Sequence, residues 1–451
     1  MTNTSDIPGP PARFLLGNLP EFKHNPLACV LNWQRDYGDI VHFKLGPRDF
    51  YLISHPELAE QALVQQQDTF IKMYDADRPN GLALILGQGL VTSSGELWRK
   101  QRRLMQPVFN RSSVVTMLPE MIQTFEKLNT RWCELPAGVA VNVADEMMRL
   151  TIEVITQTMF STSVLGRIDQ IGPALDIGLR FAAKSIMNPL RAPLWLPTRA
   201  NREFINARNF LNDTIDVIIS ERRQDSGQYH DLLQMLLEAQ DPETGEKMHD
   251  RQIRDEVLTI FSAGHETTAT ALSWTLALLA NHPEILARLR EEVAGVLNGK
   301  TPEIQDLSQL SYTRAVLEES MRIRPPVSMV MRKIATEANL QGYRLKAGGF
   351  AIFSIYNMHH HADFWVQPEV FDPERFLSAE KRNKAYMPFG IGHRFCVGNN
   401  FALIESQVLL ALMVQHFDFE LVNAQLPDME MVVTLKPKDG LPMLIRSRCY
   451  D

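Results

Sequence analysis

The sequence predicts a mainly α-helical fold with minor β structure. Apolar side chains recur at three- and four-residue spacing from about 57 to 310, and strand-like runs are confined to regions near the two ends of the chain. The composition is that of a globular protein, with 45% hydrophobic and 22% charged residues among 451. Since no Ser/Gly-rich linker divides the chain, we expect one domain over residues 1–451.

The β-rich parts come first and last. Within about residues 1–60, the runs IVHF (40–43) and FYLI (50–53) predict two strands, and GPR (46–48) predicts the hairpin turn between them. Later strands are expected in 330–356 and 430–447. Helices should form the remainder of the chain.

The longest predicted helix runs from 252 to about 281, where the sequence NHP ends it. A helix of this length spans about 45 Å, the width of a domain. Its middle, LTIFSAGHETTATALSW, is apolar nearly all round and should be buried. Gly264 and Glu266 at that centre both reduce stability, so we expect a functional reason for them.

Charge and cysteine usage exclude several classes of protein. The net charge of −7 argues against a nucleic-acid partner. The four cysteines form no CxxC pair, which argues against a zinc ribbon or a disulfide framework. We find no targeting segment and no run of about 18 apolar residues, so we expect a cytoplasmic protein without a transmembrane anchor.

Cys396 lies in the glycine-rich stretch FGIGHRFCVGNN, just before an apolar helix that begins at about Asn399. The start of a helix stabilises a thiolate, and we expect Asn399 or Asn400 to cap it. Such a thiolate can be the one protein ligand of a haem iron. The alternatives are a small buried hydrophobe, or a nucleophile with His393 as its base.

This stretch resembles the haem-binding signature of the cytochrome P-450 family. Its six fixed positions are occupied by Phe389, Gly390, Gly392, Arg394, Cys396 and Gly398. The resemblance implies the cytochrome P-450 fold, with a long central helix over a haem b whose iron is bound by Cys396 and which Phe389 contacts. Seven residues precede the proline-rich hinge PGPP at 8–11, so the chain resembles the soluble, bacterial-type members.

A second motif is Glu319-x-x-Arg322, with Arg375 in the later DPERF. Residues three apart on a helix share a face and can pair, and many such pairs are only a solvated surface. In the family this motif and the later arginine form a structural lock behind the haem. We therefore expect Glu319, Arg322 and Arg375 to be structural residues.

Trp98-x-x-x-Arg102 is a third match, on a helix that begins near Glu96. In the family these positions hydrogen-bond a haem propionate, and Arg332 and Arg394 resemble the other propionate partners. Arginine suits this role because its planar fork meets a carboxylate with two bonds. Taken alone, Trp98 is more often a core residue and Arg102 is more often a solvated one.

The helix centre, Ala263 to Thr267, resembles the oxygen-binding groove of the family. Ala263 and Thr267 share a face, and Gly264 leaves room above a porphyrin. Glu266 and Thr267 are the expected catalytic acid–alcohol relay. The alternative is a helix contact in which Thr267 bonds the Ala263 carbonyl. His265 points off this face and is not expected to be a ligand.

The resemblance implies a haem-thiolate monooxygenase that inserts one oxygen atom from O2 into a C–H bond, or a C=C bond, of a lipophilic substrate such as a terpenoid, steroid or fatty acid. The segment after Cys396 is too short for a flavin reductase, so we expect no bound flavin and a separate ferredoxin or flavodoxin with its NAD(P)H-dependent reductase. The basic run of Arg99, Lys100, Arg102 and Arg103 is the candidate docking patch. A peroxygenase or isomerase, or a non-catalytic haem sensor, is the alternative.

The family's motifs place the substrate pocket at apolar side chains: Ile85, Leu86, Ala263, Val327, Val330 and Val433. Ordinary core packing is the alternative for each of them. Arg48 and Tyr51 lie near positions at which a fatty-acid hydroxylase of the family binds a carboxylate. The histidines at 359–361 are expected to be structural, because neighbours on an extended segment point apart.

Overall fold

A computed structural model describes residues 7–72, 79–162, 168–187, 191–225, 227–240, 245, 247–378 and 383–448. Contacts divide the chain into two compact units. The first unit comprises Met1–Asp75, Met321–Phe371 and Ser378–Cys396, and the second comprises Ala76–Ser320, Asp372–Leu377 and Val397–Asp451. The single domain expected from the sequence stays a prediction.

The first unit is built on a five-stranded sheet with the order β1-β2-β8-β5-β3. Its strands are β1 (Ile40–Leu45), β2 (Arg48–Ile53), β3 (Phe70–Ile71), β5 (Met329–Ile334) and β8 (Phe350–Ser354). β2 and β8 are parallel, and the other neighbours are antiparallel. The predicted hairpin at 40–53 is therefore confirmed, and β5 and β8, two of the late strands, join it in one sheet.

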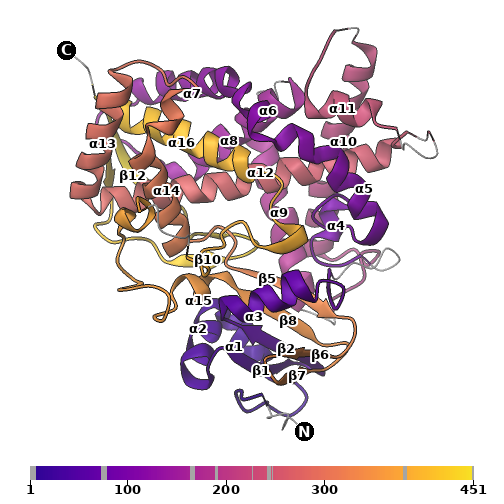
Figure 1. Ribbon diagram of the computed structural model, residues 1–451. Helices are drawn as coiled ribbons and strands as arrows, with labels where there is room; N and C mark the ends of the chain where they lie inside the picture. The colour runs from indigo at the N-terminus through magenta and orange to yellow at the C-terminus, as the bar shows by residue number, and fades with distance from the viewer. Residues whose placement is uncertain are drawn as a thin grey trace. The chain divides into compact units, whose positions relative to one another are not determined.

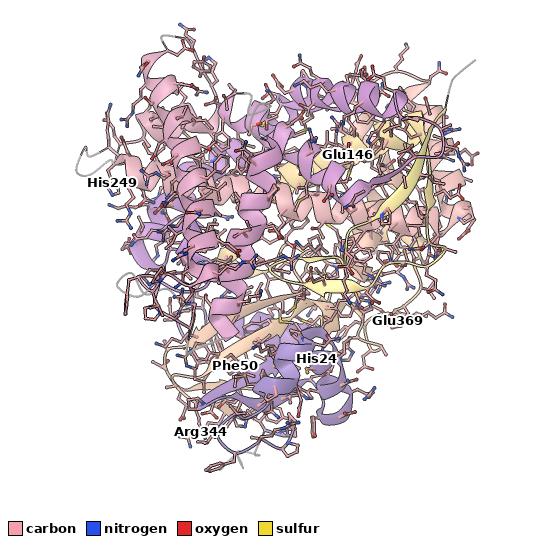
Figure 2. All side chains as sticks on the ribbon, turned by 180° about the vertical axis from the view of Figure 1, so that it is seen from behind. His24, Phe50, Glu146, His249, Arg344 and Glu369 are labelled. Carbon is pink, nitrogen blue, oxygen red and sulfur yellow. The ribbon has the colours of Figure 1, made fainter. Side chains whose placement is uncertain are left out.

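Short helices and a small hairpin complete this unit: α1 (Leu19–His24), α2 (Pro26–Tyr37), α3 (Pro56–Glu60), α15 (Ile355–His359), β6 (Ala338–Leu340) and β7 (Tyr343–Leu345). The sheet buries β-branched and aromatic side chains, including Ile53, Phe70 and Phe353. On the opposite face Phe50, labelled in Figure 2, stacks on Phe350 with ring centroids 5.0 Å apart. Both faces of the sheet are thus covered by apolar contacts.

The second unit is predominantly helical (Figure 1). Its helices are α4 (Ala83–Leu86), α5 (Gly95–Met105), α6 (Arg111–Val115), α7 (Leu118–Cys133), α8 (Val143–Phe160), α9 (Ile168–Met187), α10 (Arg199–Gln224), α11 (Leu232–Glu238), α12 (Asp250–Ala280), α13 (Pro283–Leu297), α14 (Ser311–Ile323) and α16 (Asn399–His416). The last three residues of α14, after Ser320, belong to the first unit. Its strands are β4 (Ala140–Asn142), β9 (Phe417–Leu421), β10 (Met429–Met431), β11 (Leu435–Pro437) and β12 (Pro442–Ser447). They form a three-stranded sheet, β4-β12-β9, and a separate β10–β11 hairpin.

The long central helix α12 is the predicted one, with 31 residues. Its first turn is capped by His249, whose Nδ1 accepts the N–H of Gln252 at 3.1 Å (Figure 2). α12 packs against α8, α10 and α16. A Cβ added at Gly264 would lie 2.1 Å from Cδ1 of Ile155 on α8, so the glycine allows the two helices to approach closely.

Two local predictions are wrong. Neither Asn399 nor Asn400 caps α16, because Gly398 stands at the cap position and the Asn400 amide donates to the Phe109 carbonyl instead. His359 ends the helix α15, whereas an extended segment was expected. The stretch from about 57 to 310 is mostly helical as predicted, with β3 and β4 as short strands within it. Among the described helices, none is long and apolar enough to cross a membrane.

Candidate functional site

Cys396 stands at the end of a tight loop in the first unit. Its N–H donates to the Phe389 carbonyl at 3.0 Å, which closes the loop. Gly390 and Gly392 have φ angles of 72° and 75°, which residues with a Cβ rarely adopt. A Cβ at Gly392 would also lie 2.4 Å from the carbonyl oxygen of Leu63. The glycines therefore allow the tight turns of this loop. The thiol of Cys396, at its end, is exposed.

Three cations lie close together in the same unit: Lys72, Arg332 and Arg394. Burial lowers the pKa of Arg332 to about 10. Burial, and then the positive charges of Arg332 and Arg394, hold the pKa of Lys72 well below its ordinary value. Arg332 is buried and the other two side chains are half-buried, so holding their positive charges together costs free energy. A haem carries two propionates, and its acidic edge therefore fits this cluster.

Sequence reasoning named Arg332 and Arg394 as propionate partners and missed Lys72. No motif marks this lysine. Its place follows from the antiparallel pairing of β3 with β5, in which Ile71 lies opposite Lys333, so that the next residue comes beside Arg332. Pairing between strands so far apart in the chain has no local signal.

Trp98 and Arg102 lie four residues apart on α5 in the second unit, and both are half-buried. Arg99, Lys100 and Arg103 are exposed on the same helix, where Arg99 forms an ion pair with Glu96. The helix thus carries the predicted tryptophan and arginine one turn apart, together with an exposed basic surface.

The centre of α12 has a narrow accessible strip. Between Glu256 and Leu279, Ala263, Gly264 and Thr267 are half-buried, whereas the rest are buried. The Thr267 hydroxyl donates to the Ala263 carbonyl at 2.7 Å, which is the alternative considered from the sequence. These three residues are therefore the least buried part of the helix centre.

The neighbours of Thr267 point away from this strip. Glu266 is 4% exposed, and burial raises the pKa of its carboxyl above the ordinary value. One of its oxygens accepts the hydroxyl of Thr434 at 2.8 Å, a partner that sequence reasoning missed because the two residues are distant in the chain. Burial lowers the pKa of His265 to about 4, and its Nδ1 contacts the Phe261 carbonyl, in agreement with a structural role.

The predicted pocket residues divide between the two units. Ile85 and Leu86 form α4 in the second unit and are 3% and 2% exposed, and Val433 is half-buried beside Thr434. Val327 and Val330 are partly buried against the core of the first unit.

The segment after α4 is fastened to α12 by two carboxylates. The N–H of Gln88 donates to Asp255 at 2.8 Å, and the N–H of Leu90 donates to Glu256 at 2.9 Å. Desolvation is the main reason that the pKa of Glu256 rises to about 8. These bonds hold the end of α4, and with it Leu86, close to the central helix.

The predicted lock is seen in part within each unit. In the second unit a Glu319 oxygen accepts the N–H of Asp372 at 2.9 Å and lies 3.4 Å from Nε of Arg375. In the first unit Arg322 is fully buried and donates to the carbonyls of His359 and Val370. These side chains bond backbone groups of the segments that follow α14, as expected of structural residues.

Two other patterns do not form ligand sites. The His359 ring contacts the Arg322 carbonyl through Nδ1 and accepts the Met387 N–H through Nε2. Within the described residues, no group of His, Cys, Asp and Glu side chains could hold a metal ion. Arg48 and Tyr51 lie on opposite faces of β2: Arg48 stacks over Phe350, and the Tyr51 hydroxyl accepts the N–H of Lys346.

The family model of the cytochrome P450 proteins matches residues 7–443. The chain is 35% identical to cyclooctat-9-en-7-ol 5-monooxygenase of Streptomyces melanosporofaciens over 401 residues, which is 88% of this chain and 86% of the relative. It is 36% identical to cyclooctatin synthase of the same organism, over 83% of this chain and 82% of the relative. It is 35% identical to pentalenene oxygenase of Streptomyces avermitilis, over 84% of each.

Proposed function

The chain belongs to the cytochrome P450 family, and from this we propose that it oxidises a terpenoid, inserting one oxygen atom from O2 into a C–H or C=C bond. As a member of this family it is a haem-dependent monooxygenase that acts on a lipophilic substrate with electrons from a redox partner. The observation that carries the terpenoid proposal is the similarity, over at least 83% of this chain, to relatives named for cyclooctat-9-en-7-ol, cyclooctatin and pentalenene.

Apolar lining supports a hydrocarbon-like substrate. The side chains of the second unit that we assign to the pocket are Ile85, Leu86, Ala263 and Val433. Val327 and Val330 of the first unit stay predictions from the sequence. None carries a charge or a hydrogen-bonding group, so they would bind a substrate through its apolar surface.

We assign Cys396 to the haem iron as its thiolate ligand, and the cluster of Lys72, Arg332 and Arg394 to the propionates. When bound, the iron activates O2, and electron density from the thiolate favours cleavage of the O–O bond. The closed loop keeps the sulfur in place, since the Cys396 N–H is fixed on the Phe389 carbonyl. We expect haem b, without a flavin.

Thr267 and Glu266 are the residues that we assign to proton delivery. Because the Thr267 hydroxyl donates its proton to the Ala263 carbonyl, its oxygen is left as an acceptor for a water that carries a proton. The Glu266 carboxyl, whose pKa is raised by burial, is suited to hold a proton and to release it to such a water.

The redox partner that we propose is an acidic ferredoxin or flavodoxin, reduced by an NAD(P)H-dependent reductase. The exposed Arg99, Lys100 and Arg103 on α5 form the candidate docking surface. Reversing the charge of Lys100 and Arg103 should slow the first electron transfer at low salt and leave the ferric haem spectrum unchanged. A rate equal to that of the wild type at low salt would remove α5 from the proposal.

The test of the function uses two matched variants, Cys396→Ser and Cys133→Ser. Cys133 is exposed on α7, far along the chain from the loop, and serves as the control. Wild type and the control should give the reduced carbon monoxide spectrum of a thiolate-bound haem, and Cys396→Ser should not. Terpenoids, steroids and fatty acids are then screened for spin-state shifts and for coupled NADPH consumption. Spin-state shifts without oxygenated product would favour a sensor, and peroxide-driven turnover alone a peroxygenase.

A further inference from the structure

The β10–β11 hairpin contacts the centre of α12 at two points. Thr434, in the turn of the hairpin, is 1% exposed and donates its hydroxyl to Glu266 at 2.8 Å. The next residue, Leu435, offers its carbonyl to Nε1 of Trp274 at 2.7 Å. Both bonds are buried, so this turn is fixed on the helix next to the acid.

Charged side chains fix the other side of the hairpin to α9. Lys436 on β11 pairs with Asp176 at 2.6 Å, and Asp176 also accepts from Nε of Arg180 at 2.7 Å. Arg180 in turn binds both oxygens of Glu430 on β10, each at 2.9 Å. Glu430 and Lys436 are themselves opposite each other in the hairpin. Bidentate and cross-strand pairs of this kind restrict both strands.

The same residues control the proton affinity of Glu266. Burial raises the pKa of its carboxyl, the Thr434 hydroxyl opposes that rise, and the positive charge of Lys436 opposes it further. Asp176 raises the pKa and Arg180 lowers it. The carboxyl of the central helix is thus oriented and tuned by a hairpin more than 160 residues further along the chain.

We propose that Thr434 is a positioning residue for the acid: its hydroxyl holds the Glu266 carboxyl in one orientation, and the ion network of Asp176, Arg180, Glu430 and Lys436 holds the hairpin that carries it. The inference rests on the proposed role of Glu266 in proton delivery. A carboxyl that keeps one orientation releases its proton along one path, whereas a carboxyl that loses Thr434 rotates and delivers protons less selectively. Less selective delivery converts reducing equivalents into hydrogen peroxide.

The test compares Thr434→Val, which removes the hydroxyl at similar volume, with Thr434→Ser, which keeps it. Thr158→Val is the control, because this buried hydroxyl on α8 bonds a carbonyl of its own helix. The first readout is the infrared spectrum of the resting ferric protein over a pH titration, with the Glu266 bands assigned by difference from Glu266→Gln. We expect the C=O stretch of protonated Glu266 to rise in frequency and its titration midpoint to rise in Thr434→Val, and both to stay near wild type in Thr434→Ser.

The second readout is the ratio of product to peroxide during turnover. It should fall severalfold in Thr434→Val and recover in Thr434→Ser, with the thiolate–carbon monoxide spectrum unchanged in both. Should Thr434→Val fail to fold, Asp176→Asn tests the same arrangement from its half-exposed side, and we expect a smaller fall of the same ratio.

The inference would be overturned if the infrared bands of Glu266 were unaltered in Thr434→Val. It would also be overturned if Thr434→Val kept the wild-type ratio of product to peroxide. Failure of the proposed function gives a different pattern. In that case the wild type lacks the thiolate–carbon monoxide spectrum, while the infrared bands still report the contact between Thr434 and Glu266.

Discussion

Replacing Gly264 by alanine separates two explanations of this glycine. The sequence suggests that it leaves room above a porphyrin, and the structure shows that its missing Cβ would lie 2.1 Å from Cδ1 of Ile155. Such overpacking costs about 1–3 kcal/mol. The better helix propensity of alanine returns about 1 kcal/mol. We therefore expect Gly264→Ala to be destabilised by about 0–2 kcal/mol.

The second variant, Ile155→Val, removes Cδ1, the atom that a Cβ at position 264 would overlap. The next nearest atom of Ile155, Cγ1, is 3.5 Å from the added Cβ, which is an ordinary contact. Alone, Ile155→Val costs about 0.5–1.5 kcal/mol because it leaves a small cavity. In the double variant the alanine methyl fills that cavity. We expect its stability to be close to wild type, with a coupling free energy of about 1–3 kcal/mol between the two sites.

The assay is denaturant unfolding of the four proteins, followed by circular dichroism and by haem absorbance. A coupling free energy near zero between Gly264→Ala and Ile155→Val would refute the packing argument. A double variant that is stable but binds no haem would instead favour the porphyrin explanation, since the contact with α8 has then been repaired.

Three further outcomes are expected. Thr267→Ala should bind haem and substrate but release more hydrogen peroxide per NADPH; a wild-type ratio of product to peroxide would contradict the relay. The folded-state pKa of Glu256 is about 8 against an ordinary 4.5, so the folded protein holds this proton more tightly and loses stability as pH rises between those values. Glu256→Gln should remove this loss, which is on the order of a few kcal/mol because each pKa unit is worth about 1.4 kcal/mol, and unfolding midpoints across that pH range test it. Arg222→Met leaves Asp231 buried without its 2.7 Å ion pair and should cost about 3–5 kcal/mol; the exposed Arg199 gives the control, whose removal should leave the unfolding midpoint unchanged.

The sequence was most informative where a pattern is local. The hairpin at 40–53, the helix α12 and the glycine loop before Cys396 each follow from a turn, a period or a short signature, and the structure has all three elements. The fold class, a mainly α-helical P450 fold, is likewise confirmed. The roles of individual site residues stay predictions until the variants are measured.

Predictions from local patterns failed where a side chain bonds a partner that is distant in the sequence. Asn400 has the residue type of a helix cap, yet its amide bonds the Phe109 carbonyl, a partner almost 300 residues away. Lys72 and Thr434 belong to no motif and reach Arg332 and Glu266 through strand pairing and a hairpin turn. Contacts of this kind depend on the completed fold, so a single sequence does not contain a readable signal for them.

The grouping of Lys72, Arg332 and Arg394 has a consequence for how the protein matures. Folding in the absence of a prosthetic group would have to bring these mutually repelling side chains together. Haem would then act as a counter-ion as well as a catalyst, and its supply during synthesis would limit the yield of folded protein. If the propionates are the anions that neutralise the lysine and the arginines, an iron-free porphyrin would support this step as well as haem does.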